Sequence, residues 1–371
     1  MKLAYVIYSL SNPAGMERAL ASRANFLCDE FDITIITEGQ GKVEDCFPLD
    51  KRIRRVDLDI RKTGSNREIK DDCFQKLSCF LKKEKFDVVS SLGGLELFFL
   101  YRINDGSKKV LEFCFSYDYF KIISREQGNG LMTKVMAELN TLRRVYYARK
   151  YDKIVVLTKK DELKWRRWSR KVCQIYNAGT LVSTEVSSCS SHCAIAVGRL
   201  EYAKGFDLLI EAWYDVHKVY PDWRLNIYGD GSHRKMLENM IKERKLEGIV
   251  SLCGISNNII DAYLQSSFFV LCSREEGFGL VLTEAETCGL PIVTFACPNG
   301  PAEIVEDGYN GIVVRDKENI DELAKAMKKM IADGDMRKKM GKNSLKVVGK
   351  FSVPIIKSQW IRMFNQLKCV E

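Results

Sequence analysis

Residues 273–291, SREEGFGLVLTEAETCGLP, decide the fold. The apolar run Phe268–Cys272 stands directly before them and predicts a buried strand. The loop Glu276–Gly279 then opens a helix, which we expect over 279–289. A strand, a glycine-containing loop and a helix N-terminus in this order are typical of α/β folds, where the loop binds an anion at the carboxyl edge of a parallel sheet.

Two glutamates eight positions apart add chemistry to this segment. Backbone N–H groups of the loop form a site for an anion such as a diphosphate. Glu284 lies one to two turns into the expected helix, where its carboxylate can accept two hydrogen bonds from a cis-diol such as ribose. Glu276 lies in the loop and can reach a polar group beyond the anion. An ordinary strand–loop–helix unit with surface glutamates is the alternative, and the pair of glutamates favours a binding site.

Short apolar strands alternate with longer amphipathic helices along the whole chain. We expect strands at 3–9, 32–37, 86–90, 109–115, 153–157, 194–197, 224–228, 250–253, 268–272, 291–295 and 311–314. We expect helices at 16–28, 61–85, 121–150, 204–219, 232–245, 257–265, 279–289, 318–332 and 353–368, and a glycine-broken loop at 127–130 within the third of these. Two successive runs of strand–helix units predict an α/β protein with two parallel sheets, each covered by helices on both faces.

A change of composition marks the domain boundary. Residues 180–193 are rich in Ser and Thr and poor in bulky apolar side chains, as expected for a linker. The length of 371 residues suits two domains, which we expect at 1–180 and 181–350. Residues 351–371 contain a last helix, which we expect to cross back onto the first domain.

Composition excludes several classes of protein. Hydrophobic residues make up 46% and charged residues 29% of the chain, which is typical of globular proteins and not of disordered ones. No apolar run approaches the roughly 18 residues of a membrane-spanning helix. The short apolar run at the start is interpreted as a strand rather than a signal peptide. The 13 cysteines have no regular spacing, so we expect free thiols in the cytoplasm and no metal site.

Positive charge is confined to the first half of the chain. Residues 1–180 hold 34 Lys and Arg against 24 Asp and Glu, a balance of +10, whereas the remainder has a balance of −1. Such asymmetry favours an anionic partner: nucleic acid, an acidic membrane surface or a phosphorylated acceptor. A basic surface that serves only solubility is an equally open alternative. Residues 164–171, KWRRWSRK, allow either a binding patch or a charged helix face with packed tryptophans.

A second constellation follows the first strand of the second domain. Residues 197–204, VGRLEYAK, precede Gly205 at the edge where open α/β sheets bind ligands. Arg199 can fork two phosphate oxygens, and Lys204 supplies a point charge. Solvated surface charges are the alternative. We favour phosphate contact.

The loop after the first strand has a different pattern. Residues 11–17, SNPAGME, contain one glycine, Gly15, and no G-x-G-x-x-G fingerprint, which argues against a nicotinamide or flavin enzyme. The loop 228–232, YGDGS, also follows an expected strand and suits either a phosphate-facing turn or a plain turn.

In order and spacing these residues resemble the retaining glycosyltransferases of family 4, which have the GT-B fold. The resemblance spans about 120 residues of the second half. Its pieces are Gly198–Leu200 with Lys204–Gly205, Tyr228–Gly229 with Gly231, Ser273–Pro291 with its E-x7-E pair, Asn299–Val305, Asp307–Gly308 and Asn310–Gly311. The first half matches more weakly, through Ala14–Glu17, where the family usually has two glycines.

The resemblance implies two Rossmann-like domains whose parallel sheets face each other across a cleft, an acceptor-side domain at 1–180 and a donor domain at 181–350. Arg199 and Lys204 would neutralise the donor diphosphate, Glu284 would bind the ribose and Glu276 the hydroxyls of the donor sugar. Phosphates would be held by the backbone of Gly277, Phe278, Gly279 and Leu280, with Gly15 approaching from the other domain. The resemblance implies no metal and no cofactor beyond the nucleotide sugar itself.

One position departs from the family. In that family a histidine commonly follows a first-domain strand near the donor sugar. In this chain Cys114 stands at the position where we expect that histidine. A thiol does not reproduce the hydrogen bonding of a neutral imidazole. Asp118 or a backbone carbonyl would then take over this role, or activity would be reduced.

The expected activity is retaining transfer of a hexose or N-acetylhexosamine from a nucleotide diphosphate sugar, with uridine as the expected nucleoside. The expected acceptor is a glycan or a lipid-linked sugar in bacterial surface polysaccharide, lipopolysaccharide or glycolipid assembly. The basic first half suits peripheral contact with anionic lipid at the inner face of the cytoplasmic membrane. A donor-binding pseudoenzyme, a nucleotide-sugar epimerase or phosphorylase of the same fold, and a nucleic-acid-binding protein are the alternatives.

Overall fold

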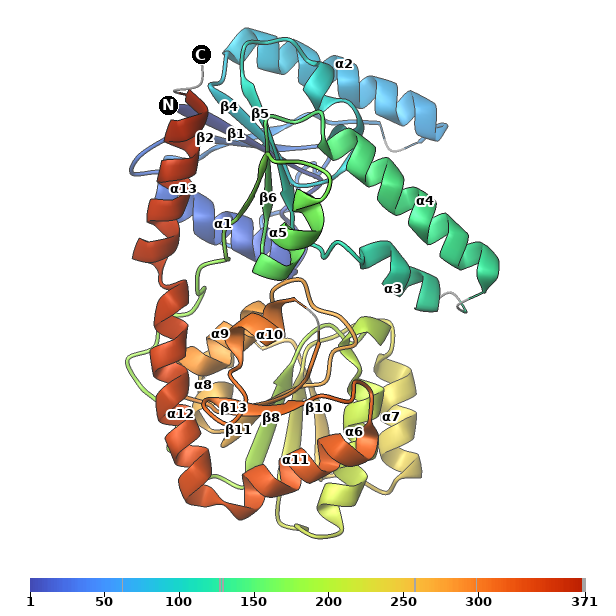
Figure 1. The fold of residues 1–371 in the computed structure, drawn as a ribbon, viewed down its shortest axis with the longest axis vertical. Helices are drawn as coiled ribbons and strands as arrows, with labels where there is room; N and C mark the ends of the chain where they lie inside the picture. Colours follow the sequence, from blue (N-terminus) through green and yellow to red (C-terminus); the bar gives the residue numbers. More distant parts are fainter. Residues whose placement is uncertain (62, 127, 129, 257, 298, 369–371) are drawn as a thin grey trace. The chain divides into compact units, whose positions relative to one another are not determined.

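The computed structural model describes residues 1–61, 63–126, 128, 130–256, 258–297 and 299–368 (Figure 1). The chain divides into two compact units. One comprises Met1–Ala178 together with Val353–Glu371, and the other comprises Gly179–Ser352. Each unit contains one parallel sheet, so the predicted α/β class with two parallel sheets is confirmed.

The sheet of the first unit has the strand order β3-β2-β1-β4-β5-β6-β7. Its strands are β1 (Lys2–Ile7), β2 (Asp32–Thr37), β3 (Arg54–Asp57), β4 (Val88–Ser91), β5 (Lys108–Phe113), β6 (Lys153–Val156) and β7 (Val172–Gln174). Its helices are α1 (Gly15–Leu27), α2 (Asn66–Glu84), η1 (Leu95–Phe98), η2 (Leu100–Arg102), α3 (Tyr119–Glu126), α4 (Leu131–Ala148), α5 (Lys159–Arg166) and α13 (Val353–Lys368).

The sheet of the second unit has the order β10-β9-β8-β11-β12-β13. Its strands are β8 (Cys193–Val197), β9 (Arg224–Tyr228), β10 (Val250–Gly254), β11 (Phe268–Leu271), β12 (Ile292–Phe295) and β13 (Gly311–Val314). Its helices are η3 (Tyr202–Lys204), α6 (Phe206–His217), α7 (Arg234–Glu243), α8 (Ile259–Leu264), α9 (Leu280–Thr287), α10 (Gly300–Ile304), α11 (Ile320–Ala332), α12 (Gly334–Val348) and η4 (Gly349–Phe351).

Parallel pairing explains why the central strands are apolar on both faces. Every residue of β11 and of β12 is buried, as expected for strands covered by helices on both sides. The short edge strands β3 and β7 are less apolar, and their patterns did not predict them. Helices α3 and α4 lie on either side of the expected loop at 127–130, of which residues 127 and 129 lie outside the described residues.

The final helix, α13, packs against α1 within the first unit. The guanidinium of Arg23 lies 4.3 Å from the ring centroid of Trp360 and 5.0 Å from that of Tyr5. Arg23 also forms a buried ion pair with Glu112 at 2.6 Å. One arginine therefore joins β1, β5, α1 and α13. Among the described residues, no helix has the length and apolar character that crossing a bilayer requires.

Two carboxyl groups are buried together at the carboxyl edge of the first sheet. Glu38 follows β2 and is 2% exposed, and Glu96 lies in η1 and is fully buried. Ser91 Oγ donates a hydrogen bond to Glu96 Oε1 at 2.6 Å. Burial, together with the neighbouring Glu96 carboxylate, raises the pKa of Glu38 to about 9. The pair therefore retains a proton at neutral pH.

We expect Glu38→Gln to stabilise the protein at pH 8 by about 1–3 kcal/mol relative to wild type, and by much less at pH 5. The pKa of Glu38 is higher in the folded state than in the unfolded chain. The folded state therefore loses stability as the pH rises from the ordinary glutamate pKa towards 9. Glutamine keeps the shape and cannot ionise. Chemical denaturation at both pH values measures the difference, and an equal effect at pH 5 and pH 8 would contradict this account.

Candidate functional site

The predicted donor-side residues lie at the carboxyl edge of the second sheet. Loops leave β8, β9, β11 and β12 at this edge because parallel strands all end there. The segments 198–205 and 273–279 belong to two of these loops. Arg199, Lys204, Glu276 and the loop at the start of α9 are therefore brought to one edge of one unit.

Close backbone contacts hold the loop 273–279 in place. A Cβ atom on Gly300 would lie 1.7 Å from the carbonyl oxygen of Phe278, and one on Gly205 would lie 2.2 Å from that of Cys272. Gly205 also has φ of +66°, which a side chain would strain. Only glycine permits both contacts. The close packing of backbone against backbone therefore explains why Gly205 and Gly300 are glycines.

Glu276 and Lys204 form an ion pair in this loop. Lys204 Nζ lies 2.5 Å from Glu276 Oε1, and Ser273 Oγ donates to the same oxygen at 2.9 Å. The Glu276 side chain is 8% exposed, whereas that of Lys204 is 21% exposed. The carboxylate is therefore fixed by a cation and a hydroxyl. Its second oxygen and the outer side of the ammonium are the parts suited to a ligand.

Glu284 is held deeper, on α9. It is 1% exposed; its Oε1 accepts a hydrogen bond from Thr180 Oγ1 at 3.0 Å and its Oε2 accepts one from Tyr263 OH at 3.1 Å. A diol that binds Glu284 would add to these hydroxyls or replace one of them. Sequence reasoning missed both partners, because Thr180 lies in the expected linker and Tyr263 in an unremarkable helix.

The start of α9 is the expected anion site. Gly279 is its N-cap with φ of +86°, and among the described residues no side chain caps the helix. The amide groups of the first turn at Leu280 are those that a helix cannot pair internally. They and the helix dipole favour an anion at the Gly277–Gly279 loop.

Arg199 differs from Lys204 in its surroundings. Its side chain is exposed, in the loop after β8, and adds to the hydrogen bonds from Ser232 that lower the pKa of Glu201. Arg199 therefore lies at the outer rim of the edge, whereas Lys204 is already paired within it.

Arg274 is a structural residue that the sequence did not reveal. Its guanidinium is bound to Asp207 of α6 at 2.6 Å and to Glu318 at 3.1 Å, and it donates to the carbonyl of Tyr202 at 2.9 Å. Burial opposes the charge, yet pairing with Asp207 raises the pKa of Arg274 above its ordinary value. Arg274 joins the loop that contains Glu276 to the one that contains Lys204.

Asn299 is a second residue that the sequence did not reveal as special. It follows β12, is 1% exposed and has φ of +86°. Both polar atoms of its side chain lack a hydrogen-bond partner among the described residues. Buried unpaired amide atoms and a left-handed backbone each destabilise a fold, and such costs are common at functional sites. Its neighbour Gly300 contacts Phe278, so Asn299 lies beside the expected anion loop.

The remaining predicted residues belong to the first unit. Gly15 is the first residue of α1. Asp118 lies between β5 and α3 and is ion-paired with Lys164 of α5. Cys114 follows β5, and burial, with the Glu112 carboxylate nearby, raises the pKa of its thiol to about 12. The thiol is therefore neutral at physiological pH and does not act as a base.

Glu17 was not singled out from the sequence. It lies in the first turn of α1, is 4% exposed, and accepts a hydrogen bond from Asn12 Nδ2 at 3.3 Å. Its other oxygen, Oε2, has no partner among the described residues.

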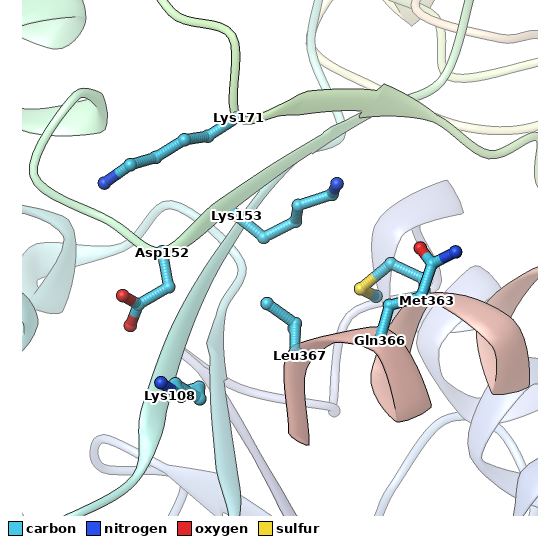
Figure 2. A pocket seen from close by; sticks show the side chains of 7 residues that line it. All are labelled: Lys108, Asp152, Lys153, Lys171, Met363, Gln366 and Leu367. Atoms are coloured by element: carbon cyan, nitrogen blue, oxygen red, sulfur yellow. The ribbon is translucent and has the colours of Figure 1, made fainter. Parts of the chain in front are cut away.

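A cavity of about 620 Å³ lies elsewhere on the first unit (Figure 2). Lys108 and Lys153 line it from the amino ends of β5 and β6, and Met363 and Leu367 line it from α13. None of the predicted site residues lines this cavity. It lies at the edge opposite to the one where parallel sheets bind ligands.

We expect Gly300→Ala to destabilise the protein by about 2 kcal/mol or more, because a methyl group cannot fit against the Phe278 carbonyl without a backbone shift. Gly349→Ala is the matched control, since a Cβ there meets nothing within 4 Å. Denaturant titration of both variants measures the effect. Equal stability of the two variants would show that the loop is not held by this contact.

Known proteins resemble this chain in two ways: one family model matches within the second unit, and relatives match over nearly the whole length. Residues 190–347 match the family described as "Glycosyl transferases group 1". An uncharacterized glycosyltransferase of Haemophilus influenzae is 27% identical over 97% of this chain and 98% of its own length. The Campylobacter jejuni protein named GalNAc-alpha-(1->4)-GalNAc-alpha-(1->3)-diNAcBac-PP-undecaprenol alpha-1,4-N-acetyl-D-galactosaminyltransferase is 26% identical over 99% of both chains.

A solved structure shows the same fold. The Anabaena protein HepE, crystallised with UDP and glucose, superposes with a TM-score of 0.80 over 98% of this chain and 99% of its own, at 18% identity. The fold is therefore GT-B, as predicted. The family match and the relatives named above support a glycosyltransferase.

Proposed function

We propose that this chain, a GT-B glycosyltransferase by its matches, transfers a hexose or N-acetylhexosamine from a UDP-sugar to a glycan or lipid-linked acceptor, with retention of the anomeric configuration, as in glycosyltransferase family 4. The observation that carries the proposal is the arrangement around Glu276. Lys204 is paired with this carboxylate beside the start of α9, which no side chain of the described residues caps, and Glu284 lies in α9 itself.

The donor diphosphate is the group that this edge suits best. The first-turn amides of α9 and the ammonium of Lys204 supply positive potential to a leaving group that gains negative charge as the sugar departs. Arg199, exposed at the rim, supplies a second cation that can fork two phosphate oxygens. Two cations and a helix terminus together take the part that a metal ion has in other transferases.

Glu276 and Glu284 bind the two ends of the donor. Glu276 accepts hydrogen bonds from the sugar hydroxyls, and Lys204 exchanges part of its contact with Glu276 for the phosphate. Glu284 accepts hydrogen bonds from the ribose diol, in competition with Thr180 and Tyr263. The HepE structure, which contains UDP and glucose, supports a uridine donor for this chain.

Retention follows from attack on the face from which the nucleotide leaves. In this route the departing phosphate helps to deprotonate the acceptor hydroxyl, so no protein base is required at position 114. The neutral thiol of Cys114 is consistent with that route. Asp118 stays a candidate for orienting the sugar or acceptor, although its ion pair with Lys164 would have to open.

The acceptor class is proposed from the relatives and from charge. The Campylobacter jejuni relative is named for an undecaprenol-diphosphate-linked glycan, which is an anionic lipid. The first unit carries the positive excess of the chain. A lipid-linked or glycan acceptor in surface polysaccharide, lipopolysaccharide or glycolipid assembly, used at the inner face of the cytoplasmic membrane, fits both observations.

Cys114 favours one second candidate, a donor-binding protein without turnover. It would bind UDP-sugars with Glu276 and Glu284 intact and transfer nothing to any acceptor. A nucleotide-sugar epimerase or phosphorylase of the same fold would be recognised by product formation without an acceptor, or by dependence on inorganic phosphate.

We expect wild-type protein to release nucleotide slowly from one member of a panel of nucleotide sugars. Glu276→Ala should lower that rate about 100-fold or more, because it removes the carboxylate that holds the sugar and the partner of Lys204. Glu247→Ala, on an exposed surface, is the control and should not change the rate. Nuclear magnetic resonance of the glycoside product reports the anomeric configuration. Absence of both nucleotide binding and release in wild type would refute the proposal.

We expect wild type to bind UDP at least about tenfold more tightly than 2′,3′-dideoxy-UDP, and Glu284→Ala to lose this preference. The reason is that hydrogen bonds to a charged carboxylate contribute about 1.5–3 kcal/mol each. Isothermal titration calorimetry of wild type and Glu284→Ala with both nucleotides measures how much of the preference for UDP depends on Glu284. Glu286→Gln is the control, since Glu286 faces Asn310 and not the ligand edge. An unchanged preference for UDP in Glu284→Ala would show that Glu284 does not bind the ribose.

A further inference from the structure

Helix α4 exposes an apolar stripe that nothing in the first unit covers within the described ranges. Leu131 and Met132 are 81% and 75% exposed. The stripe consists of seven large exposed side chains: Leu131, Met132, Val135, Met136, Leu139, Leu142 and Tyr146. Large apolar side chains scattered singly on a surface are ordinary, but seven on one helix of 18 residues are not.

The stripe lies opposite the face that holds the helix in the fold. Its members recur at intervals of three and four residues, which places them on one side of a helix. Ala137, Thr141, Val145 and Ala148 are buried and form the packed side. Helix α3 lies against α4 (Figure 1) and leaves the stripe exposed. The exposure therefore belongs to a well-packed helix and is not a frayed end.

Positive charge surrounds the stripe. Residues 119–150, which include α3 and α4, hold seven Lys and Arg against two Asp and Glu, a balance of +5. Lys134, Arg143, Arg149 and Lys150 are exposed on or directly after α4. Glu138, its one acidic residue, is paired with Lys121 of α3 at 2.9 Å. An apolar face bordered by cations is typical of helices that lie in the interface of an anionic membrane.

A second copy of the chain fits this surface less well. A helix of 18 residues is about 27 Å long, so its stripe of about 10 Å width offers about 270 Å². Stable interfaces bury about 800 Å² per partner. Two copies would also bring like charges together, whereas anionic headgroups would neutralise them.

We propose that α4 lies in the surface of an anionic lipid bilayer, with its apolar stripe among the acyl chains and its exposed basic neighbours Lys134, Arg143, Arg149 and Lys150 at the headgroups. The inference deepens the proposed function by naming the element that contacts the membrane, and it rests on that function for the acceptor alone. As a consequence, the enzyme would reach a lipid-linked acceptor by diffusion along the membrane surface, and the acceptor would not have to leave the bilayer.

The test is cosedimentation of the full chain with vesicles of phosphatidylcholine, with and without phosphatidylglycerol. The test variant is Leu131→Gln/Leu139→Gln/Leu142→Gln, and the matched control is Val43→Gln/Val219→Gln/Ile255→Gln, which alters three exposed apolar residues elsewhere. Wild type and control should bind vesicles that contain phosphatidylglycerol. The affinity of the α4 variant for these vesicles should be lower by a factor of about ten or more. Lys134→Glu/Arg149→Glu should abolish the preference for phosphatidylglycerol.

Three results would overturn the proposal. The α4 variant could bind vesicles as wild type does, wild type could fail to bind anionic vesicles at low salt, or sedimentation velocity could show a wild-type dimer that only the α4 variant loses while vesicle binding is equal. Thermal unfolding checks that each variant is folded. UDP affinity and nucleotide release, measured on the same samples without vesicles, separate the outcomes: failure of vesicle binding with intact donor hydrolysis rejects this inference and leaves the proposed function standing.

Discussion

The candidate site depends on the close approach of the Gly300 backbone to the carbonyl of Phe278, which leaves no room for a Cβ. Two backbones can approach so closely only where there is no side chain, and this contact fixes the loop that opens α9. Arg274 holds the other side of the same loop through Asp207 and the carbonyl of Tyr202. Glu276 therefore projects from a segment that is fixed at both sides, which is what a preorganised binding group requires.

The two glutamates of the motif differ in how they are held. Glu276 forms an ion pair with Lys204, which balances its negative charge beside the expected anion loop. Glu284 accepts hydrogen bonds from two hydroxyl groups, those of Thr180 and Tyr263. A lysine shared between a carboxylate and a phosphate can move from one to the other without leaving either uncompensated for long. This difference gives the segment 276–284 two chemically distinct ends.

Sequence patterning predicted the fold because its signals are periodic. Fully apolar runs such as Phe268–Cys272 identify buried parallel strands, and the GT-B fold expected from the motifs is confirmed. Edge strands such as β3 were not predicted, because they are only half buried and contain charged residues. The motif residues Lys204, Glu276 and Glu284 could be picked out by type and spacing, and their roles stay predictions. Thr180, Arg274 and Asn299 could not, because hydrogen bonds across long sequence separations, burial and backbone strain leave no periodic trace.

The ion pair of Arg23 with Glu112, covered by Trp360, has a consequence for how the protein is made. The first unit is discontinuous in sequence, since the whole second unit is translated between its sheet and α13. Before α13 emerges from the ribosome, Arg23 and the apolar face of α1 lack the helix that shields them from water. The second unit, continuous from Gly179 to Ser352, can complete its core first. The packing of the first unit is therefore completed last, although most of its residues are translated first.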